Sequence, residues 1–168
     1  RPTSGILLFS RTSKSLARLN ELFRSRQIQK TYWAVVKQAP KEASGKLENY
    51  LFKNQEKNRS FVTKDKKKGQ FAELSYKVLD KSDVYTLLEI NPKTGRHHQI
   101  RVQLSNMGSP IKGDVKYGFD RANKDKSIHL HARSIHFVHP IKKEEMNLFA
   151  KVPPDNLWNF FEANGNAE

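Results

Sequence analysis

The 168-residue chain contains no cysteine, and this absence removes several classes of protein from consideration. A disulfide-stapled scaffold, a thiolate zinc site and a cysteine nucleophile each need a residue that the chain does not have. Long apolar runs are also missing: no stretch approaches the roughly 18 residues of a membrane span, and no apolar signal segment opens the chain. We therefore expect a soluble, cytoplasmic protein without membrane contact.

Acidic residues are few beside basic ones: 17 Asp and Glu stand against 31 Lys and Arg, giving a formal net charge of +14. Such an excess on a small domain attracts polyanions, of which nucleic acid is the commonest. A merely solvated charged face is the alternative. The basic residues recur along the chain instead of forming one tail, which indicates a charged folded surface and favours a nucleic-acid partner. They gather in residues 11–26, 64–68, 93–101, 112–126 and 142–151.

Hydrophobic patterning predicts one α+β domain over residues 1–168, with a mostly antiparallel mixed sheet flanked by helices. Helices are expected from an N-cap within 10–13 to about residue 25, over 97–107, and after Pro153. Glycine and proline make 108–118 a loop of fixed shape. Strands are expected at 6–9, 30–36, 47–53, 70–79, 84–90 and 128–138, with a further pairing at 61–62.

Arg101 is the first candidate for a functional side chain. If residues 97–107 are helical, Ile100, Leu104 and Met107 share one face, and Arg101 lies beside it at the boundary of core and cleft. A poorly hydrated guanidinium there seeks a carboxylate or phosphate partner. The alternative is a surface arginine whose stem covers apolar area, and spacing alone leaves the two open.

Arg96, His97 and His98 stand at the start of the same helix, where free backbone N–H groups favour anions such as phosphate. Adjacent histidines also suggest a metal site, but on a helix they point in different directions and lack a nearby carboxylate pair. A second group comprises His129, His131, His136 and His139, of which all but His136 would share one strand face. Without cysteine or a fitting carboxylate, we interpret these as structural or RNA-facing side chains and expect no metal.

Tyr32 shares one strand face with Ala34 and Val36. Core packing is the commoner fate of such a tyrosine, whereas stacking on a nucleic-acid base is the functional alternative. The sequence gives little support for other kinds of catalytic site. Ser4 is not in a Gly-x-Ser-x-Gly elbow, and no phosphate-binding P-loop is present.

Five segments in order carry known motifs: T-S-G before an apolar strand, K-x-Y-x-A-x-V, T-G-R-x-H-Q-[IL]-R-V, G-x-P-I-x-G-D-x-x-Y-G, and L-H-A…F-x-H-P. Together they span nearly the whole chain, which resembles the RluA-like RNA pseudouridine synthases. These enzymes convert uridine to pseudouridine in ribosomal or transfer RNA. The matching residues are 3–8, then 30, 32, 34 and 36, then 94–102 except 97, then 108, 110, 111, 113, 114, 117 and 118, then 130–132, 137, 139 and 140.

The resemblance puts the family's nucleophilic aspartate immediately before Arg1, outside the chain. The sequence opens abruptly, without methionine, into an apolar run, so we expect a truncated catalytic domain; an inactive protein is the alternative. The family's N-terminal RNA-binding module is expected to be missing as well. His97 replaces a frequent Thr or Ser, a change that we expect the helix start to tolerate.

The resemblance also implies roles for particular residues. Arg101 would pair with the nucleophile and keep it ionised, and Tyr32 would pack on the uracil and assist proton transfer. Thr3, Ser4 and Gly5 would support the nucleophile loop, with the 6–9 strand as its anchor. Asp114 is interpreted as a turn residue. Arg96, His97, His98 and Lys112 are expected to contact RNA.

No cofactor is expected, since the isomerisation needs no redox change or external group, and the protein is expected to be a monomer. Two other functions stay open at this point. One is a non-catalytic RNA-binding module with the same fold, and the other is a ribosome-associated structural protein.

Overall fold

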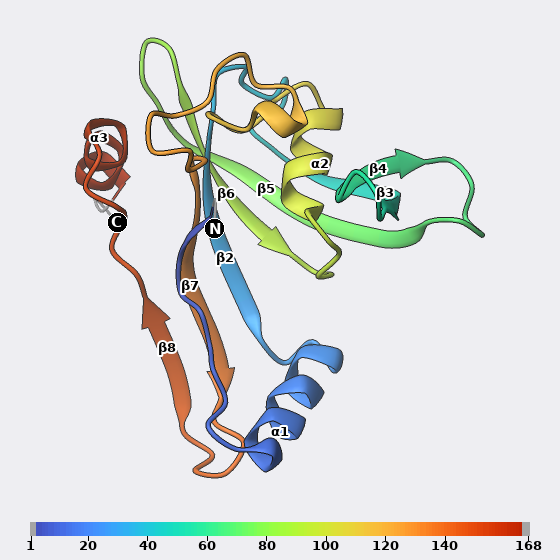
Figure 1. The fold of residues 1–168 in the computed structure, drawn as a ribbon. Coiled ribbons are helices and arrows are strands. Elements are labelled where there is room, and N and C mark those ends of the chain that lie inside the picture. Colours follow the sequence, from blue (N-terminus) through green and yellow to red (C-terminus); the bar gives the residue numbers. More distant parts are fainter. Residues whose placement is uncertain (1–2, 166–168) are drawn as a thin grey trace.

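A single sheet of eight strands organises the chain in the computed structural model, which describes residues 3–165 (Figure 1). The strand order is β1-β7-β2-β6-β5-β3-β4, and β8 also pairs with β7. Among residues 3–165, only the β1–β7 pair is parallel, which confirms an α+β domain with a mostly antiparallel sheet. The strands are β1 Ser4–Gly5, β2 Gln29–Val36, β3 Ser44–Asn54, β4 Arg59–Thr63, β5 Gln70–Lys81, β6 Thr86–Pro92, β7 Leu130–Val138 and β8 Glu145–Phe149.

Three α-helices flank the sheet within residues 3–165, in the three regions that the sequence predicted: α1 Ser13–Arg24, α2 Gln99–Asn106 and α3 Asn156–Gly165. A one-turn 3₁₀ helix, Val115–Tyr117, lies within the 108–118 loop. Thr12 caps α1: its hydroxyl accepts the Ser15 N–H at 3.1 Å, and its own N–H donates to Ser15 Oγ at 3.2 Å. No helix among the described residues is long and apolar enough to span a membrane.

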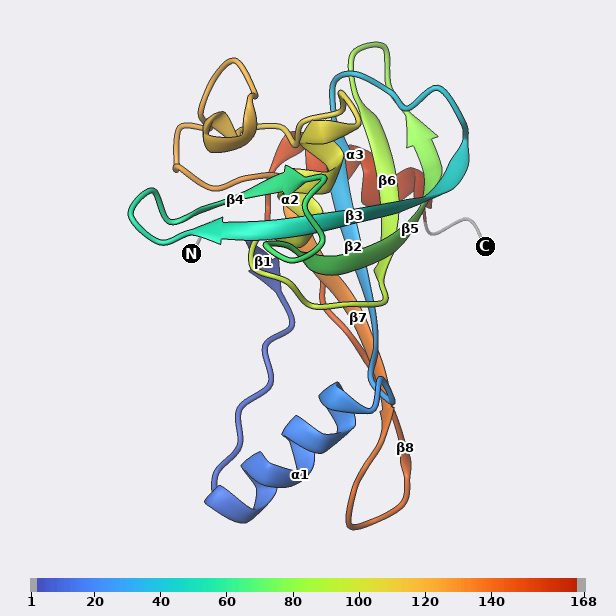
Figure 2. The same cartoon turned by 90° about the vertical axis from the view of Figure 1, so that its right-hand side faces the viewer.

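The alternating side chains of β2 pack into separate clusters on the two faces of the sheet. Ala34 and Val36 face α2, where they join a cluster that includes Ile100 and Leu104. Trp33 and Val35 face α3 in a second cluster, with Leu87, Trp158 and Phe161. Figure 2 shows α3 behind the central strands. The predicted alternation of β2 is therefore confirmed.

The predicted strand over residues 6–9 is wrong. The strand is two residues earlier, at Ser4–Gly5, and residues 6–10 are not in a strand, although the Ile6 N–H still donates to the Ala132 carbonyl at 3.0 Å. Ile6 and Leu8 pack under α1, whereas Leu7 and Phe9 are 72% and 81% exposed. The reason is that one edge of β7 is shared: β1 pairs at residues 131–132, and β8, which was not among the predicted strands, takes 134–138.

Candidate active site

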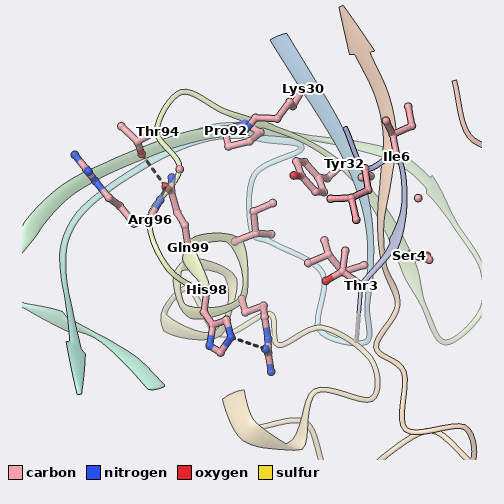
Figure 3. Close-up of a pocket in the computed structure, with 17 residues that line it drawn as sticks. Thr3, Ser4, Ile6, Lys30, Tyr32, Pro92, Thr94, Arg96, His98 and Gln99 are labelled. Atoms are coloured by element: carbon pink, nitrogen blue, oxygen red, sulfur yellow. Dashed lines mark hydrogen bonds between the residues drawn. The ribbon is translucent and has the colours of Figure 1, made fainter. Parts of the chain in front are cut away.

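A cavity of about 530 Å³ lies between the N-terminal segment, β2 and the turn that leads into α2 (Figure 3). Its volume is in the range of small-molecule sites. Seven of the site residues that the sequence singled out line it: Thr3, Ser4, Gly5, Tyr32, Arg96, His98 and Arg101.

Arg101 is buried in one wall of this cavity rather than lying on the surface. Its Nε–H and an Nη2–H donate to the two carboxylate oxygens of Asp114, each at 2.7 Å. The side chains of Arg101 and Asp114 are only 10% and 1% exposed. The guanidinium carbon also lies 4.8 Å from the centre of the Tyr117 ring. This bidentate pair fixes the plane of the guanidinium at the boundary of core and cleft.

Asp114 therefore does more than the turn residue that the sequence indicated. Its backbone does form turns, accepting the Tyr117 N–H at 3.0 Å, but its carboxylate is the ion-pair partner of Arg101. The position before Arg1, where the resemblance puts another carboxylate, lies outside the described residues. Among residues 3–165, the contacts of Arg101 use three of its five N–H groups, leaving one on each Nη atom.

His98 supports Arg101 from the helix start. Its Nε2 lies 3.2 Å from Arg101 Nη1, and its Nδ1 lies 2.9 Å from Tyr117 Oη. Because a guanidinium only donates, Nε2 accepts and the proton lies on Nδ1, which donates to the tyrosine oxygen. Burial and the nearby charge of Arg101 lower the pKa of His98 to about 4. His98 is therefore neutral at pH 7 and holds Arg101 without adding positive charge.

Backbone strain marks the same residue. His98 has φ 53°, in the left-handed region that non-glycine residues seldom adopt. Its two hydrogen bonds hold the ring there, so α2 begins at Gln99, two residues later than the predicted start. Such strain persists only where surrounding contacts enforce it.

The turn between β6 and α2 is held by Gln99, a residue that sequence reasoning did not single out. Its Oε1 accepts the Thr94 hydroxyl at 2.8 Å and the Arg96 N–H at 2.9 Å, and its Nε2 donates to the Glu73 carbonyl at 3.0 Å. Figure 3 shows Arg96 extending away from Tyr32. Its Nε–H donates to the Phe71 carbonyl at 2.9 Å. The T-G-R-x-H-Q pattern thus closes a turn that orients Arg96.

The opposite wall is the N-terminal segment, docked on β7. Ser4 Oγ lies 2.8 Å from His131 Nδ1, and His131 Nε2 lies 3.2 Å from the Ala150 carbonyl. A carbonyl only accepts, so Nε2 carries the proton and Nδ1 accepts the Ser4 hydroxyl. Gly5 has φ 104°, and a Cβ at this position would lie 2.3 Å from the Ala132 oxygen. Glycine alone allows this approach, which holds Thr3–Gly5 at the cavity rim.

Tyr32 projects into the cavity between these walls (Figure 3). Its ring also contacts the core cluster that contains Ala34 and Val36, so core packing and cavity lining are both present. Burial raises the pKa of Tyr32, and the phenol is protonated at neutral pH. Lys30, two residues earlier on β2, lines the cavity too, and burial lowers its pKa.

Two of the residues expected to contact RNA lie away from this cavity. The His97 ring stacks on His98 with centroids 3.8 Å apart, and its Nδ1 lies 2.9 Å from Ser60 Oγ. Lys112 lines a second cavity of about 590 Å³, and its Nζ donates to Asn123 Oδ1 at 2.8 Å. Thr3 and Ser4 line both cavities, so the two spaces meet at the N-terminal segment.

The histidines of the second group lie in different environments. His129 and His131 are buried against the ring of Trp158, and His129 Nε2 lies 3.2 Å from Asp155 Oδ1. His139, expected on the same strand face, follows the end of β7 and accepts backbone N–H groups in a turn. Within residues 3–165, no three metal-ligating side chains are grouped to hold an ion.

Comparison with known proteins identifies the family of the chain. The family model for RNA pseudouridylate synthase matches residues 1–106. Ribosomal large subunit pseudouridine synthase C of Buchnera aphidicola subsp. Acyrthosiphon pisum is 36% identical, over 92% of this chain and 51% of its own length. tRNA pseudouridine synthase C of Vibrio parahaemolyticus is 32% identical, over 94% of this chain and 70% of its own. The chain belongs to the RNA pseudouridine synthase family.

Solved structures show the same fold. Human RNA Pseudouridylate Synthase Domain Containing 4 aligns with a TM-score of 0.71 at 26% identity, covering 91% of this chain and 69% of that one. The domain is therefore a pseudouridine synthase fold. The chain spans 51% of the length of the Buchnera relative.

Proposed function

We propose that this protein isomerises uridine to pseudouridine in ribosomal or transfer RNA, and that residues 1–168 form its catalytic domain. We further propose that it acts as a cytoplasmic monomer. One observation carries the proposal: a buried, oriented guanidinium, a protonated tyrosine and the Thr3–Gly5 segment line one cavity. The family motif joins the nucleophilic aspartate to this segment, only three positions before Thr3.

The reaction breaks the N1–C1′ bond of uridine and forms a C5–C1′ bond in its place. The proton on C5 leaves to solvent, and N1 gains one, so no oxidant, reductant or external group takes part. The aspartate acts covalently on the nucleotide. The N–H groups that Arg101 retains on its two Nη atoms stabilise this carboxylate in its ionised form, while Asp114 and His98 hold the guanidinium in place.

The ring of Tyr32 packs on the uracil, and its hydroxyl assists proton transfer. The target uridine must leave its stack to enter the cavity. Arg96 at the cavity rim and Lys112 in the adjoining cavity contact the flanking phosphates. His97 contributes by holding the helix start rather than by charge, because burial and nearby cations lower its pKa.

We also propose that residues 1–168 alone do not turn over, because the carboxylate nucleophile of the motif is not among them. Tritium release from RNA labelled at uridine C5 tests both statements, since every turnover frees the C5 hydrogen. The full-length protein is expected to release tritium, and the polypeptide 1–168 is expected to bind RNA without release.

Arg101→Ala in the full-length protein separates catalysis from binding. Turnover is expected to vanish with less effect on RNA affinity, since the guanidinium lies inside the cavity and not on the basic surface. Equal loss of both, or a folded full-length protein that releases no tritium from any RNA, favours a non-catalytic RNA-binding module.

A further inference from the structure

Four aromatic rings lie on the outer face of β3, β4 and β5, the face that α2 does not cover. The strand register pairs Phe52 with Phe61 and Tyr50 with Phe71. The Phe52 and Phe61 rings are stacked with centroids 5.5 Å apart, and those of Tyr50 and Phe71 lie edge to face at 5.7 Å. Together, Tyr50, Phe52, Phe61 and Phe71 are called the aromatic face below.

No helix among the described residues covers this face. The alternate residues Leu51 and Ala72 point the other way and are buried with Val102 of α2. Helix α3 packs on the same side of the sheet, but near the other end of β5, beside Leu79. Figure 1 shows α3 at the opposite end of the molecule from β3 and β4. The aromatic face therefore lies outside the packed core.

Cations lie over these rings. Lys66 Nζ is 5.6 Å from the centre of the Tyr50 ring, and Lys68 Nζ is 5.3 Å from that of Phe52. Both belong to the exposed loop 64–68, which carries four lysines and one aspartate. Arg59 Cζ lies 5.1 Å from the Phe61 centroid. A face that combines aromatic rings with positive charge suits a ligand that has both flat π-systems and negative charge.

The aromatic face adjoins the cavity. Arg96, at the cavity rim, donates its Nε–H to the Phe71 carbonyl at 2.9 Å, and the Phe71 ring contacts Tyr50. The contacts thus run from Arg96 at the cavity rim, through the backbone of Phe71, to the Phe71 and Tyr50 rings, and Lys66 of the loop lies over the Tyr50 ring. A strand that delivers one nucleotide to the cavity has a path along which its neighbours can lie.

We propose that the aromatic face binds an unpaired stretch of the substrate RNA adjoining the target uridine. Its bases stack on the rings, and Lys66 and Lys68 pair with its phosphates. The lysines are free to leave the rings, because their stems are flexible and an exposed cation–π contact is weaker than a stacked base. The proposal rests on the proposed function only for the identity of the partner as RNA.

Two double variants of the full-length protein test the two halves of this contact. The measurement is fluorescence-anisotropy titration with a single-stranded RNA of roughly ten nucleotides, over about 50 to 200 mM salt. Phe52→Leu with Phe61→Leu is expected to weaken binding roughly tenfold or more without changing the salt slope, since only stacking is lost. Lys66→Ala with Lys68→Ala is expected to reduce the slope of log affinity against log salt by about 1.4, from about 0.7 per phosphate contact.

Matched controls use exposed residues elsewhere: Phe149→Leu for the aromatic change, and Lys142→Ala with Lys151→Ala for the charge change. Thermal unfolding verifies that each variant folds. The inference is overturned if the Phe52/Phe61 variant folds and binds the RNA like the Phe149 control. It is equally overturned if that variant loses stability in the full-length protein but not RNA affinity, which would assign the face to another part of the protein.

The same variants separate this inference from the proposed function. If the wild type releases tritium and the Phe52/Phe61 variant binds RNA unchanged, the RNA-binding role of the aromatic face is rejected and the proposed isomerase function is kept. If RNA binding depends on Phe52 and Phe61 but the full-length protein releases no tritium, the isomerase function is rejected and the RNA-binding role of the aromatic face is supported.

Discussion

The two walls of the cavity are built differently. The wall carrying Arg101 is buried and cross-linked, with Asp114, His98 and Tyr117 all contacting one guanidinium. The wall carrying Thr3–Gly5 is a two-residue strand on one neighbour, followed by a segment whose Leu7 is 72% exposed. Local stability follows burial and hydrogen bonding. We therefore expect the first wall to open only when the whole protein unfolds, and the second wall to open by local unfolding while the rest of the protein stays folded.

This difference has a consequence for catalysis. The guanidinium is preorganised at no cost during the reaction, whereas the proposed nucleophile is joined to the wall that is easier to displace. Changes to the first wall should therefore appear as loss of global stability. Changes to the second should appear as local opening and lost turnover in a protein that is still folded.

The largest effect is expected from Asp114→Asn. The substitution keeps the shape of the side chain but leaves the buried charge of Arg101 without its counter-charge, which costs about 3 to 5 kcal/mol of unfolding free energy. Denaturant unfolding measures it, with Asp120→Asn as the control, since Asp120 is exposed on the same loop. Equal losses of unfolding free energy in the two variants would contradict the claim that the Arg101–Asp114 pair makes this wall rigid.

Gly5→Ala attacks the second wall. The added Cβ would lie 2.3 Å from the Ala132 oxygen, at φ 104°, so β1 must leave β7. We expect little change in global unfolding but a large rise in amide exchange at Ile6, whose N–H donates to the Ala132 carbonyl at 3.0 Å. Gly95→Ala is the matched control, because its new Cβ meets nothing within 4 Å. Unchanged exchange at Ile6 would contradict the close docking of this segment.

A pH titration probes the first wall again, with a smaller effect. The pKa of His98 is about 4 in the folded state, chiefly because of burial, against 6.5 for the free side chain. The unfolded chain thus binds a proton first, and stability present above pH 6.5 is lost as the pH falls from about 6.5 toward 4. His129 and His131 shift in the same direction, so the test is the difference between wild type and His98→Asn.

Asparagine tolerates the left-handed backbone of His98 and does not titrate. The variant is expected to lose part of the acid sensitivity, and NMR of the wild-type ring should give a pKa well below 6.5. A normal pKa for His98 would mean that the ring does not accept from Arg101.

Ser4→Ala should have the smallest effect. It removes one hydrogen bond, from Ser4 Oγ to His131 Nδ1 at 2.8 Å, worth about 1 kcal/mol. Amide exchange at Ile6 should rise about fivefold, while global stability stays within error. Ser13→Ala, at the exposed start of α1, is the control. A rise as large as that of Gly5→Ala would show that the hydrogen bond, and not the glycine, holds the segment.

The features that the sequence predicted well are periodic ones. Alternation in β2 assigned Tyr32, Ala34 and Val36 to one face, and helical spacing put Arg101 at the edge of a buried face. Both patterns depend only on local geometry. The resemblance added the expectation that Thr3–Gly5, Tyr32 and Arg101 belong to one site, which periodicity could not predict.

What was missed depends on partners distant in the chain. Asp114 lies in a glycine-bounded loop, and nothing local shows that its carboxylate reaches back 13 positions to Arg101. The 6–9 run has the composition of a strand, but β8 already occupies the edge of β7 that it would need. Gln99 stood inside a motif, yet only the fold brings the Glu73 carbonyl to its side chain.

The most direct test of the account compares turnover and RNA affinity in Arg101→Lys of the full-length protein. Lysine keeps the charge but cannot form the bidentate pair with Asp114 and still donate from two further N–H groups to the cavity. We predict a loss of at least about a hundredfold in tritium release, with RNA affinity within about twofold of wild type. Turnover close to that of wild type would contradict an oriented guanidinium as the centre of this site.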